Sequence, residues 1–286
     1  MTYQKRDITY EFTLAQGTFD DSSNTLTISN CKSELTLGAY GSSAGNQLNL
    51  KIYGLSLEYM AKLSYKGQLG LGIAQNLMKV TVNDQVLFLG TIVAAYSDFN
   101  QMPDAPLILD ARATGYEQSV VCAPTFKKGP ANVADMIAAL AKLMGYSFSN
   151  NGVTTVEDSP HYNGSAVDQI NAIAKNNGIE LDMRQGSITI WPEDGARDTT
   201  KLFVSPESGL IGYPYFAMQG INFTTMFSSE LIYGREVELK TDLPDASGDY
   251  IIKQGTTHYL STWVEGGPWF TMVVAGPKIA FQGNNA

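Results

Sequence analysis

The sequence has few of the residues on which most enzymatic and covalent chemistry depends. Its 286 residues include two histidines and two cysteines. So little imidazole leaves almost no scope for histidine-based catalysis or metal binding. Cys31 and Cys122 are too few for a disulfide framework and have no CxxC spacing, so we expect two reduced, buried thiols.

The sequence also lacks long apolar runs. No stretch approaches the roughly 18 apolar residues of a membrane span, and residues 1–7 contain no apolar segment of signal-peptide type. We therefore expect a soluble protein made in the cytoplasm, with no membrane insertion.

Positive charge is scarce as well, with 19 Lys and Arg against 28 Asp and Glu and a net charge of −9. Nucleic-acid binding depends on clustered Lys and Arg that replace counterions, so the composition disfavours a sequence-reading DNA binder. An acidic surface is equally compatible with a protein past which DNA slides without being held.

Two motifs resemble catalytic loops, and neither has the right context. Residues 41–45 read Gly-Ser-Ser-Ala-Gly, the GxSxG of serine hydrolases with Ser43 as nucleophile, but the flanking segments are strands, which favours a hairpin turn. Residues 67–72 are glycine-rich without the order of a phosphate loop or a dinucleotide fold, which favours a mobile loop.

The remaining candidates for chemistry are isolated histidines and acidic turns. His161 and His258 belong to no ligand motif, so we expect no metal site. The acidic groups at 20–21, 193–194 and 242–249 could hold a cation or act as paired carboxylates, but their Ser, Gly, Pro and Asn neighbours favour solvated turns. We predict no catalytic, cofactor-binding or metal-binding residue.

Between residues 135 and 181 the sequence contains two copies of a pattern that predicts a helix, a terminating glycine and a strand. The residues that recur 33 positions later are Asp135, Ile137, Ala139, Ala141, Lys142 and Gly145, repeated as Asp168, Ile170, Ala172, Ala174, Lys175 and Gly178. The first helix carries an apolar stripe, with Asn132 as its N-cap. Two copies are too few for a solenoid, so the pattern predicts a compact α/β domain.

Strand patterns occupy both sides of this repeat. We expect strands at 8–14, 25–29, 35–39, 48–52, 77–82, 86–95 and 107–113, and again at 201–204, 220–225, 236–240, 248–253, 256–262 and 269–274. Ser56 is placed to cap a short helix between the fourth and fifth of these strands. The predicted class is α+β, mainly β, with parts at 1–125, 126–197 and 198–286.

Aromatic residues crowd one stretch of the last part, at positions 213, 215, 216, 223, 227 and 233. We interpret them chiefly as core, because aromatics spaced along strands usually are. The alternatives are a sugar-stacking platform and a subunit contact.

Two stretches resemble the hub proteins of bacteriophage tail baseplates: Asn49-Leu-Lys-Ile-Tyr-Gly-Leu-Ser56 with its helix, and 205–214 continuing through Ile232-Tyr-Gly-Arg235 to 266–270. The repeat lying between two β-rich parts completes the resemblance. It implies two β-barrel domains of the tail-tube type with an inserted α/β domain. It further implies a homotrimer whose six barrels match a sixfold tube above and a threefold spike below, around an acidic lumen.

We therefore expect a non-enzymatic, structural virion protein of the tail baseplate, assembled in the host cytoplasm. The expected partners are two further copies, a tail tube or distal tail protein, a spike or tail fibre protein, and DNA that passes through the lumen without specific binding. The alternatives are a cell-wall or glycan-binding module in residues 128–196 and a hydrolase that uses Ser43 or the acidic turns.

Overall fold

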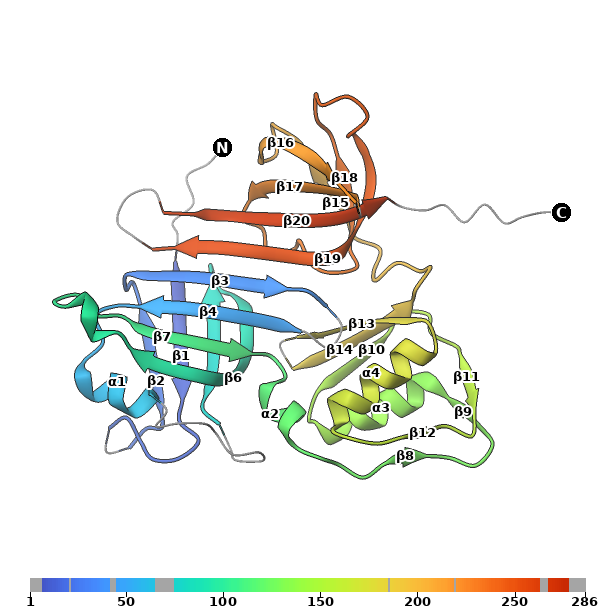
Figure 1. The fold of residues 1–286 in the computed structure, drawn as a ribbon, viewed down its shortest axis with the longest axis horizontal. Helices are drawn as coiled ribbons and strands as arrows, with labels where there is room; N and C mark the ends of the chain where they lie inside the picture. Colours follow the sequence, from blue (N-terminus) through green and yellow to red (C-terminus); the bar gives the residue numbers. More distant parts are fainter. Residues whose placement is uncertain are drawn as a thin grey trace.

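The structure is a computed structural model that describes residues 7–20, 22–41, 45–64, 75–184, 186–218, 220–262 and 267–277 (Figure 1). Strands account for 49% of it and helices for 15%, so the protein is mainly β, as the sequence predicts.

Most strands belong to a first lobe at the N-terminal end and a second lobe at the C-terminal end. The strands of the first lobe are β1 (Ile8–Thr13), β2 (Thr25–Ser29), β3 (Ser33–Ala39), β4 (Asn46–Ile52), β5 (Leu77–Val82), β6 (Gln85–Ser97) and β7 (Leu107–Arg112). Those of the second lobe are β15 (Lys201–Val204), β16 (Leu210–Ala217), β17 (Gly220–Met226), β18 (Glu236–Leu239), β19 (Gly248–Ser261) and β20 (Trp269–Pro277).

The strands of both lobes hydrogen-bond into one 13-stranded sheet. Its order is β16-β17-β20-β19-β3-β4-β7-β6-β5-β1-β2, and β18 and β15 extend from β19 as a side branch. The middle of this path crosses from one lobe to the other, because β19 pairs with β3 (Figure 1).

The first lobe closes around a large core. Ile8, Tyr10 and Phe12 alternate along β1 and are buried, as the period of two requires. Asn83 and Asp84 both have positive φ, which makes the tight turn between β5 and β6. Helix α1 (Leu57–Leu63) begins after Ser56, whose side chain accepts the Tyr59 N–H as predicted.

An inserted segment lies beside the lobes. It consists of β8 (Thr125–Phe126), β9 (Pro130–Asn132), α3 (Val133–Leu143), β10 (Ser147–Asn150), β11 (Val156–Asp158), β12 (His161–Tyr162), α4 (Ala166–Asn176), β13 (Ile179–Arg184) and β14 (Ser187–Pro192). The two helices pack over the β10-β14-β13 sheet. Helix α2 (Gly115–Ser119) and the 3₁₀ turn η1 (Phe99–Gln101) lie before this segment, on the first-lobe side.

The repeated helix-strand pattern of the sequence is present in the inserted segment. Asn132 caps α3 through the Asp135 N–H, as predicted, and Ser165 and Asp168 form a capping box on α4. The two copies differ in how their strands pair, because β10 runs parallel to β14 whereas β13 runs antiparallel to it.

Several details depart from the predictions. The segments 248–253 and 256–262, expected as two strands, form the single strand β19 with a bulge near its middle. Strand β16 and the short strands β8, β9, β11 and β12 were not predicted. Cys31 and Cys122 are free thiols, but they are half-buried rather than buried.

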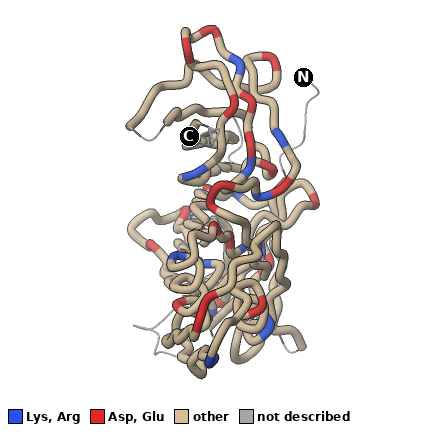
Figure 2. The backbone as a smooth tube through the Cα atoms, turned by 90° about the vertical axis from the view of Figure 1, so that its right-hand side faces the viewer, with Lys and Arg blue, Asp and Glu red and all other residues tan. Residues whose placement is uncertain are grey.

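Charged residues do not gather into a single-sign stripe in the view of Figure 2, where acidic and basic positions alternate along the backbone. Among the described residues, no helix is both long enough and apolar enough to span a bilayer.

Candidate assembly interface

Five strands of the first lobe correspond to five strands of the second lobe. In chain order β3, β4, β5, β6 and β7 correspond to β16, β17, β18, β19 and β20, and both sets pair in the same order. The outer strands differ, because β1 pairs antiparallel with β5 whereas β15 pairs parallel with β18. The protein therefore contains one five-strand arrangement twice.

Register and burial fix how the two copies correspond. In the first lobe, Ala111 lies opposite Leu48 on one side and Ile92 on the other. In the second lobe, Ala275 lies opposite Ile221 and Ile252 in the same way. These residues are all buried, so the two rows face their cores identically.

A shared irregularity supports the same correspondence. β6 has a bulge directly after Ile92, and β19 has one directly after Ile252. Bulges bend a strand and change its twist, so they are positional features of a fold. Gly255 lies in the second bulge with a φ of +89°, and a Cβ there would collide with the carbonyl oxygen of Ala39.

The joint between the lobes is the antiparallel pairing of β19 with β3, from Thr256 opposite Ala39 to Ser261 opposite Glu34. At its centre Leu37 faces His258, and both are almost fully buried. The His258 Nδ1 lies 2.8 Å from the Thr271 hydroxyl. Burial, with a smaller contribution from Arg184, lowers the pKa of His258 to about 4, so the joint holds a neutral imidazole.

The eight strands from β16 to β6 are called the shared sheet below. One of its edges is β16, where Ile211, Tyr213, Tyr215 and Phe216 are exposed and Met218 just beyond the strand is fully exposed. Figure 1 shows β16 at the far end of the stacked strands from β6. The expectation that residues 213, 215 and 216 are core is wrong, whereas Phe223 and Tyr233 are buried.

The opposite edge is the second half of β6. Its first half pairs with β5 through residues 85–91, and its second half pairs with β7 through residues 91–97. The Ile92 N–H donates to the Asn76 carbonyl at 2.8 Å, and among the described residues no strand pairs with the other side of β6 beyond residue 92. Unpaired strand edges with apolar side chains drive association, so both edges are candidates for contacts with other chains.

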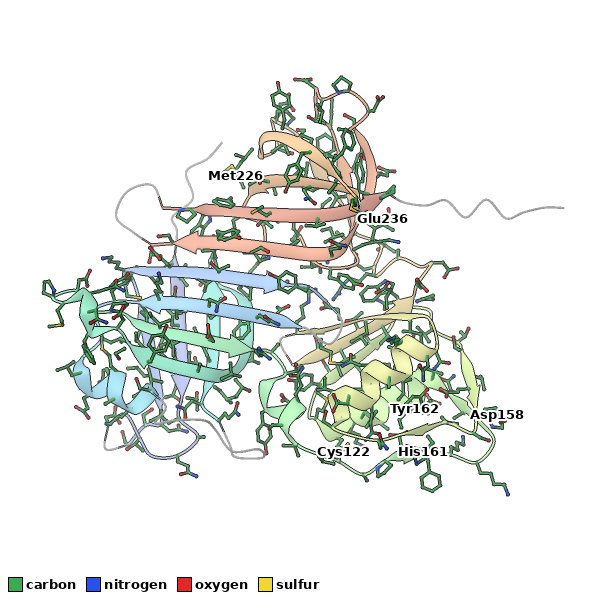
Figure 3. All side chains as sticks on the ribbon, in the orientation of Figure 1. Cys122, Asp158, His161, Tyr162, Met226 and Glu236 are labelled. Atoms are coloured by element: carbon green, nitrogen blue, oxygen red, sulfur yellow. The ribbon has the colours of Figure 1, made fainter. Side chains whose placement is uncertain are left out.

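The sequence-derived candidates for chemistry do not form a catalytic group. Ser43 and residues 67–72 lie outside the described residues. His161 lies on β12 near Cys122 and Tyr162 in the inserted segment, far from His258 on β19 (Figure 3). Asp20 accepts hydrogen bonds from the N–H groups of Ser22 and Ser23, as expected for a turn acid. No three His, Cys, Asp or Glu side chains in the described ranges are grouped to hold a metal ion.

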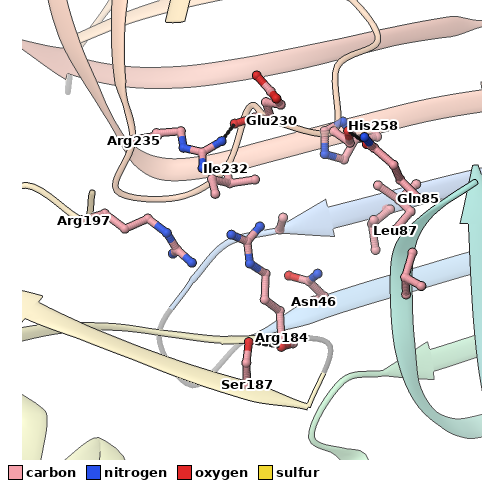
Figure 4. Close-up of a pocket in the computed structure, with 14 residues that line it drawn as sticks. Asn46, Gln85, Leu87, Arg184, Ser187, Arg197, Glu230, Ile232, Arg235 and His258 are labelled. Carbon is pink, nitrogen blue, oxygen red and sulfur yellow. Dashed lines mark hydrogen bonds between the residues drawn. The ribbon is translucent and has the colours of Figure 1, made fainter. Parts of the chain in front are cut away.

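A polar cavity of about 420 Å³ lies below the joint, where both lobes meet the inserted segment (Figure 4). Leu37 and His258 line it from the joint, and Arg184, Arg197 and Arg235 line it from the other side. The Arg235 Nη1 donates to the Glu230 carbonyl at 2.9 Å. The two serine hydroxyls in its lining are engaged elsewhere, because Ser187 donates to the Arg184 carbonyl at 2.8 Å and Ser229 donates to Gln85 Oε1 at 2.6 Å.

Ion pairs fix the connector between β14 and β15, which links the inserted segment to the second lobe. Asp182 on β13 binds Arg184 at 2.9 Å and Arg197 at 2.5 Å, and all three are largely buried. Arg197 also donates to the Tyr233 carbonyl, and the Tyr233 hydroxyl binds Glu180. Burial lowers the pKa of Arg184 to about 10, although Asp182 opposes this effect.

A second pair strengthens this contact. Arg235 binds Asp198 with Nη2 at 3.0 Å and Nε at 3.1 Å. Burial alone would raise the pKa of Asp198, but hydrogen bonds from Arg235 and Thr200 lower it. The connector thus binds Asp182 of the inserted segment through Arg197 and Arg235 of the second lobe through Asp198, whereas the two lobes are joined by backbone pairing.

The sequence matches the family described as "Baseplate hub gp41" over residues 75–260. No curated protein matches it. Among solved structures, a tail protein of Neisseria meningitidis MC58 is similar, with a TM-score of 0.66, 10% identity, and 94% of this chain and 96% of that one covered. So is a 43 kDa tail protein of prophage MuSo2 from Shewanella oneidensis, with a TM-score of 0.63, 8% identity, and 96% and 97% covered.

A third similar structure is a type VI secretion system component from E. coli, described as structurally similar to the T4 bacteriophage tail proteins gp27 and gp5. Its TM-score is 0.60 at 10% identity, with 86% of this chain and 74% of that one covered. At identities this low, these structural similarities show a shared fold alone.

Proposed function

The chain belongs to the baseplate hub gp41 family, and from this membership we propose that three copies form a ring that joins the tail tube to the spike or fibre complex. The family supports a structural role in the phage tail, and the similar tail proteins share the fold. The finer proposal concerns the number of copies, the partners and the central channel.

The observation that carries this proposal is the duplication of the lobe. One chain presents the same five-strand arrangement twice, joined edge to edge by β3 and β19. Three such chains would present six equivalent lobes on one side while keeping true threefold symmetry. A ring of this kind can contact a sixfold tube and a threefold spike at once.

We assign the lobes to tube-like β-barrel domains at 1–125 and 198–286, with an α/β domain at 126–197 inserted between them. The inserted segment lies to one side of the shared sheet in Figure 1, with its own core between α3, α4 and their sheet. In the proposed ring it would lie outside the channel.

The exposed face of the shared sheet in the first lobe fits passage of DNA. Glu34, Thr36, Asn49, Lys51 and Asp110 line a shallow groove there. Glu34 and Lys51 are 3.8 Å apart, and Asn49 donates to Asp110. Two carboxylates, Glu34 and Asp110, and one ammonium group, Lys51, lie in this groove, an excess of negative charge that is compatible with the acidic lumen that the family resemblance implies. The groove presents no row of basic groups to hold phosphates.

The mass of the purified full chain in solution tests this function. We expect a species of three copies in sedimentation or light scattering at micromolar concentration. A monomer that persists at tens of micromolar, alone and with its tail partners, would contradict the proposal. The account also predicts no muralytic or esterase activity.

A further inference from the structure

The β3–β19 joint inside the chain can be compared, position by position, with the two free edges of the shared sheet, β16 and the second half of β6. In the second lobe, Thr271 pairs with His258; in the first, the corresponding Leu107 pairs with Ser97. Ser97 therefore occupies the position of His258. By the same register Leu48 pairs with Leu37, and the corresponding Ile221 pairs with Phe216, so Phe216 occupies the position of Leu37.

Exposure at these matched positions differs sharply. Leu37 is 1% exposed and Ala39 is 5% exposed; Leu37 belongs to the apolar cluster of the first lobe, and β19 pairs beside both residues. Their counterparts on the β16 side, Phe216 and Met218, are 58% and 104% exposed. The residues beside the internal joint are thus buried, whereas the residues at the matching positions of the free edge are exposed. Phe216 and Met218 at the free edge are also the larger side chains.

We propose that β16 of one copy pairs antiparallel with the second half of β6 of the next copy, reproducing the β3–β19 joint between chains. The internal joint sets Thr256 opposite Ala39, Thr257 opposite Gly38 and His258 opposite Leu37. The matching contacts between copies are Ala95 with Met218, Tyr96 with Ala217 and Ser97 with Phe216. This inference rests on the proposed ring and specifies which edges close it.

The chemistry of the two edges suits this pairing. Burial of Phe216 and Met218 removes a large apolar area from water, which stabilises association at roughly 25 cal/mol per Å². At the matching positions Ser97 is smaller than His258 and Phe216 is larger than Leu37, so the larger side chain of this pair stands on β16 rather than on β6. A β6–β16 contact is head-to-tail, so its repetition closes a ring when the rotation permits.

Among the described residues the sheet also ends at β15 and at β2, and β2, at the other end of the main path, is the competing partner for β16. It has no counterpart in the second lobe, and the internal joint gives no precedent for its use. A pairing of β16 with β2 is therefore the alternative that an experiment must separate from β6.

A cysteine cross-link measures the register directly. Six strands lie between β16 and β6, so their edges are roughly 34 Å apart along the sheet at about 4.8 Å per strand. A disulfide between them must join two copies. In the full chain with Cys31 and Cys122 replaced by Ser, we expect Tyr96→Cys with Ala217→Cys to yield linked dimers and trimers on oxidation. The matched pair Thr27→Cys with Ala217→Cys, which tests β2, is expected to yield none.

A charge at the edge provides the second readout. Phe216→Lys is expected to weaken association by about a hundredfold, as for a central aromatic contact, while leaving the monomer folded by circular dichroism. Phe203→Lys places the same charge on an exposed Phe of β15 in the same lobe and is expected to leave association unchanged.

The outcomes separate the two proposals. A ring that links through Thr27→Cys, or that tolerates Phe216→Lys, overturns the β6–β16 joint while the ring itself stands. If the chain with none of these substitutions remains monomeric, the ring itself is overturned.

Discussion

The first and second lobes share a strand order but not a core. Among the described residues, the apolar cluster of the first lobe has 24 buried members, 23 of its own and Leu260 from β19, and the cluster of the second lobe has 11. β1 supplies Ile8, Tyr10 and Phe12 to the first core, whereas β15 in the second lobe supplies only the buried Val204. The second lobe also carries the exposed aromatic edge. A lobe with a smaller core depends more on its neighbours, namely the joint, the ion pairs of the inserted segment and, in the proposed ring, the next copy.

Core truncation in each lobe gives the largest expected effect. Phe12→Ala in the first lobe and Phe223→Ala in the second each remove a buried ring and should cost about 3–5 kcal/mol of unfolding free energy. We expect Phe223→Ala to open the second lobe alone, seen as faster amide exchange in β17 and β20 with β4 unchanged. Equal loss of protection in both lobes after either change would show that they unfold as one unit.

Breaking the buried ion pair between Asp182 on β13 and Arg197 on the connector to the second lobe should cost about as much. Arg197→Met leaves Asp182 with one cation fewer, and removal of one partner of a buried pair typically costs about 3–5 kcal/mol. Urea unfolding measures the change. Adding Asp182→Asn should recover part of the loss, because the unpaired carboxylate is then gone. A double variant less stable than both single variants would argue against this electrostatic account.

Acid should weaken the joint between the lobes. The pKa of His258 is about 4 in the folded protein and about 6.5 when unfolded, so the unfolded state binds more protons between these values. Stability from the neutral His258 is complete above pH 6.5 and falls as the pH drops to 4, by about 3 kcal/mol. Unfolding curves measured across this range test the slope, with His258→Gln as the control. A variant with the same slope as the native chain would show that other groups set it.

The smallest effect is expected at the exposed pair Glu34 and Lys51 on the face of the shared sheet. Their charges are about half exposed and 3.8 Å apart, and such pairs contribute about 0–1 kcal/mol. Lys51→Met should therefore change thermal stability by a degree or two at most. A large loss of stability would show that this face is far less solvated than its exposure indicates.

Local patterns predicted much of this fold. The strand at β1 and the Ser56 and Asn132 caps all depend on neighbours within a few residues, and each is present as predicted. The sequence Ile-Tyr-Gly occurs at residues 52–54 and again at 232–234; the first copy begins at the last residue of β4, and the second lies between β17 and β18.

What the sequence did not reveal depends on distant or irregular features. Gly212 and Pro214 interrupt the alternation of β16 at an irregular register, so its strand pattern and its exposed aromatics were not recognised. The β3–β19 joint connects residues more than 200 positions apart, and no local pattern encodes such a pairing. The cluster of Asp182, Arg197 and Arg235 is likewise assembled from separate segments of the chain.

Electron microscopy of the purified full chain tests the central claim most directly, namely that the joint inside the chain is repeated between chains. We predict top views with six lobes around a central hole and threefold symmetry. We also predict a continuous β-sheet across the subunit boundary, in which β6 of one copy lies beside β16 of the next. Isolated two-lobed particles, or a twofold dimer in which β16 meets its own counterpart, would contradict it.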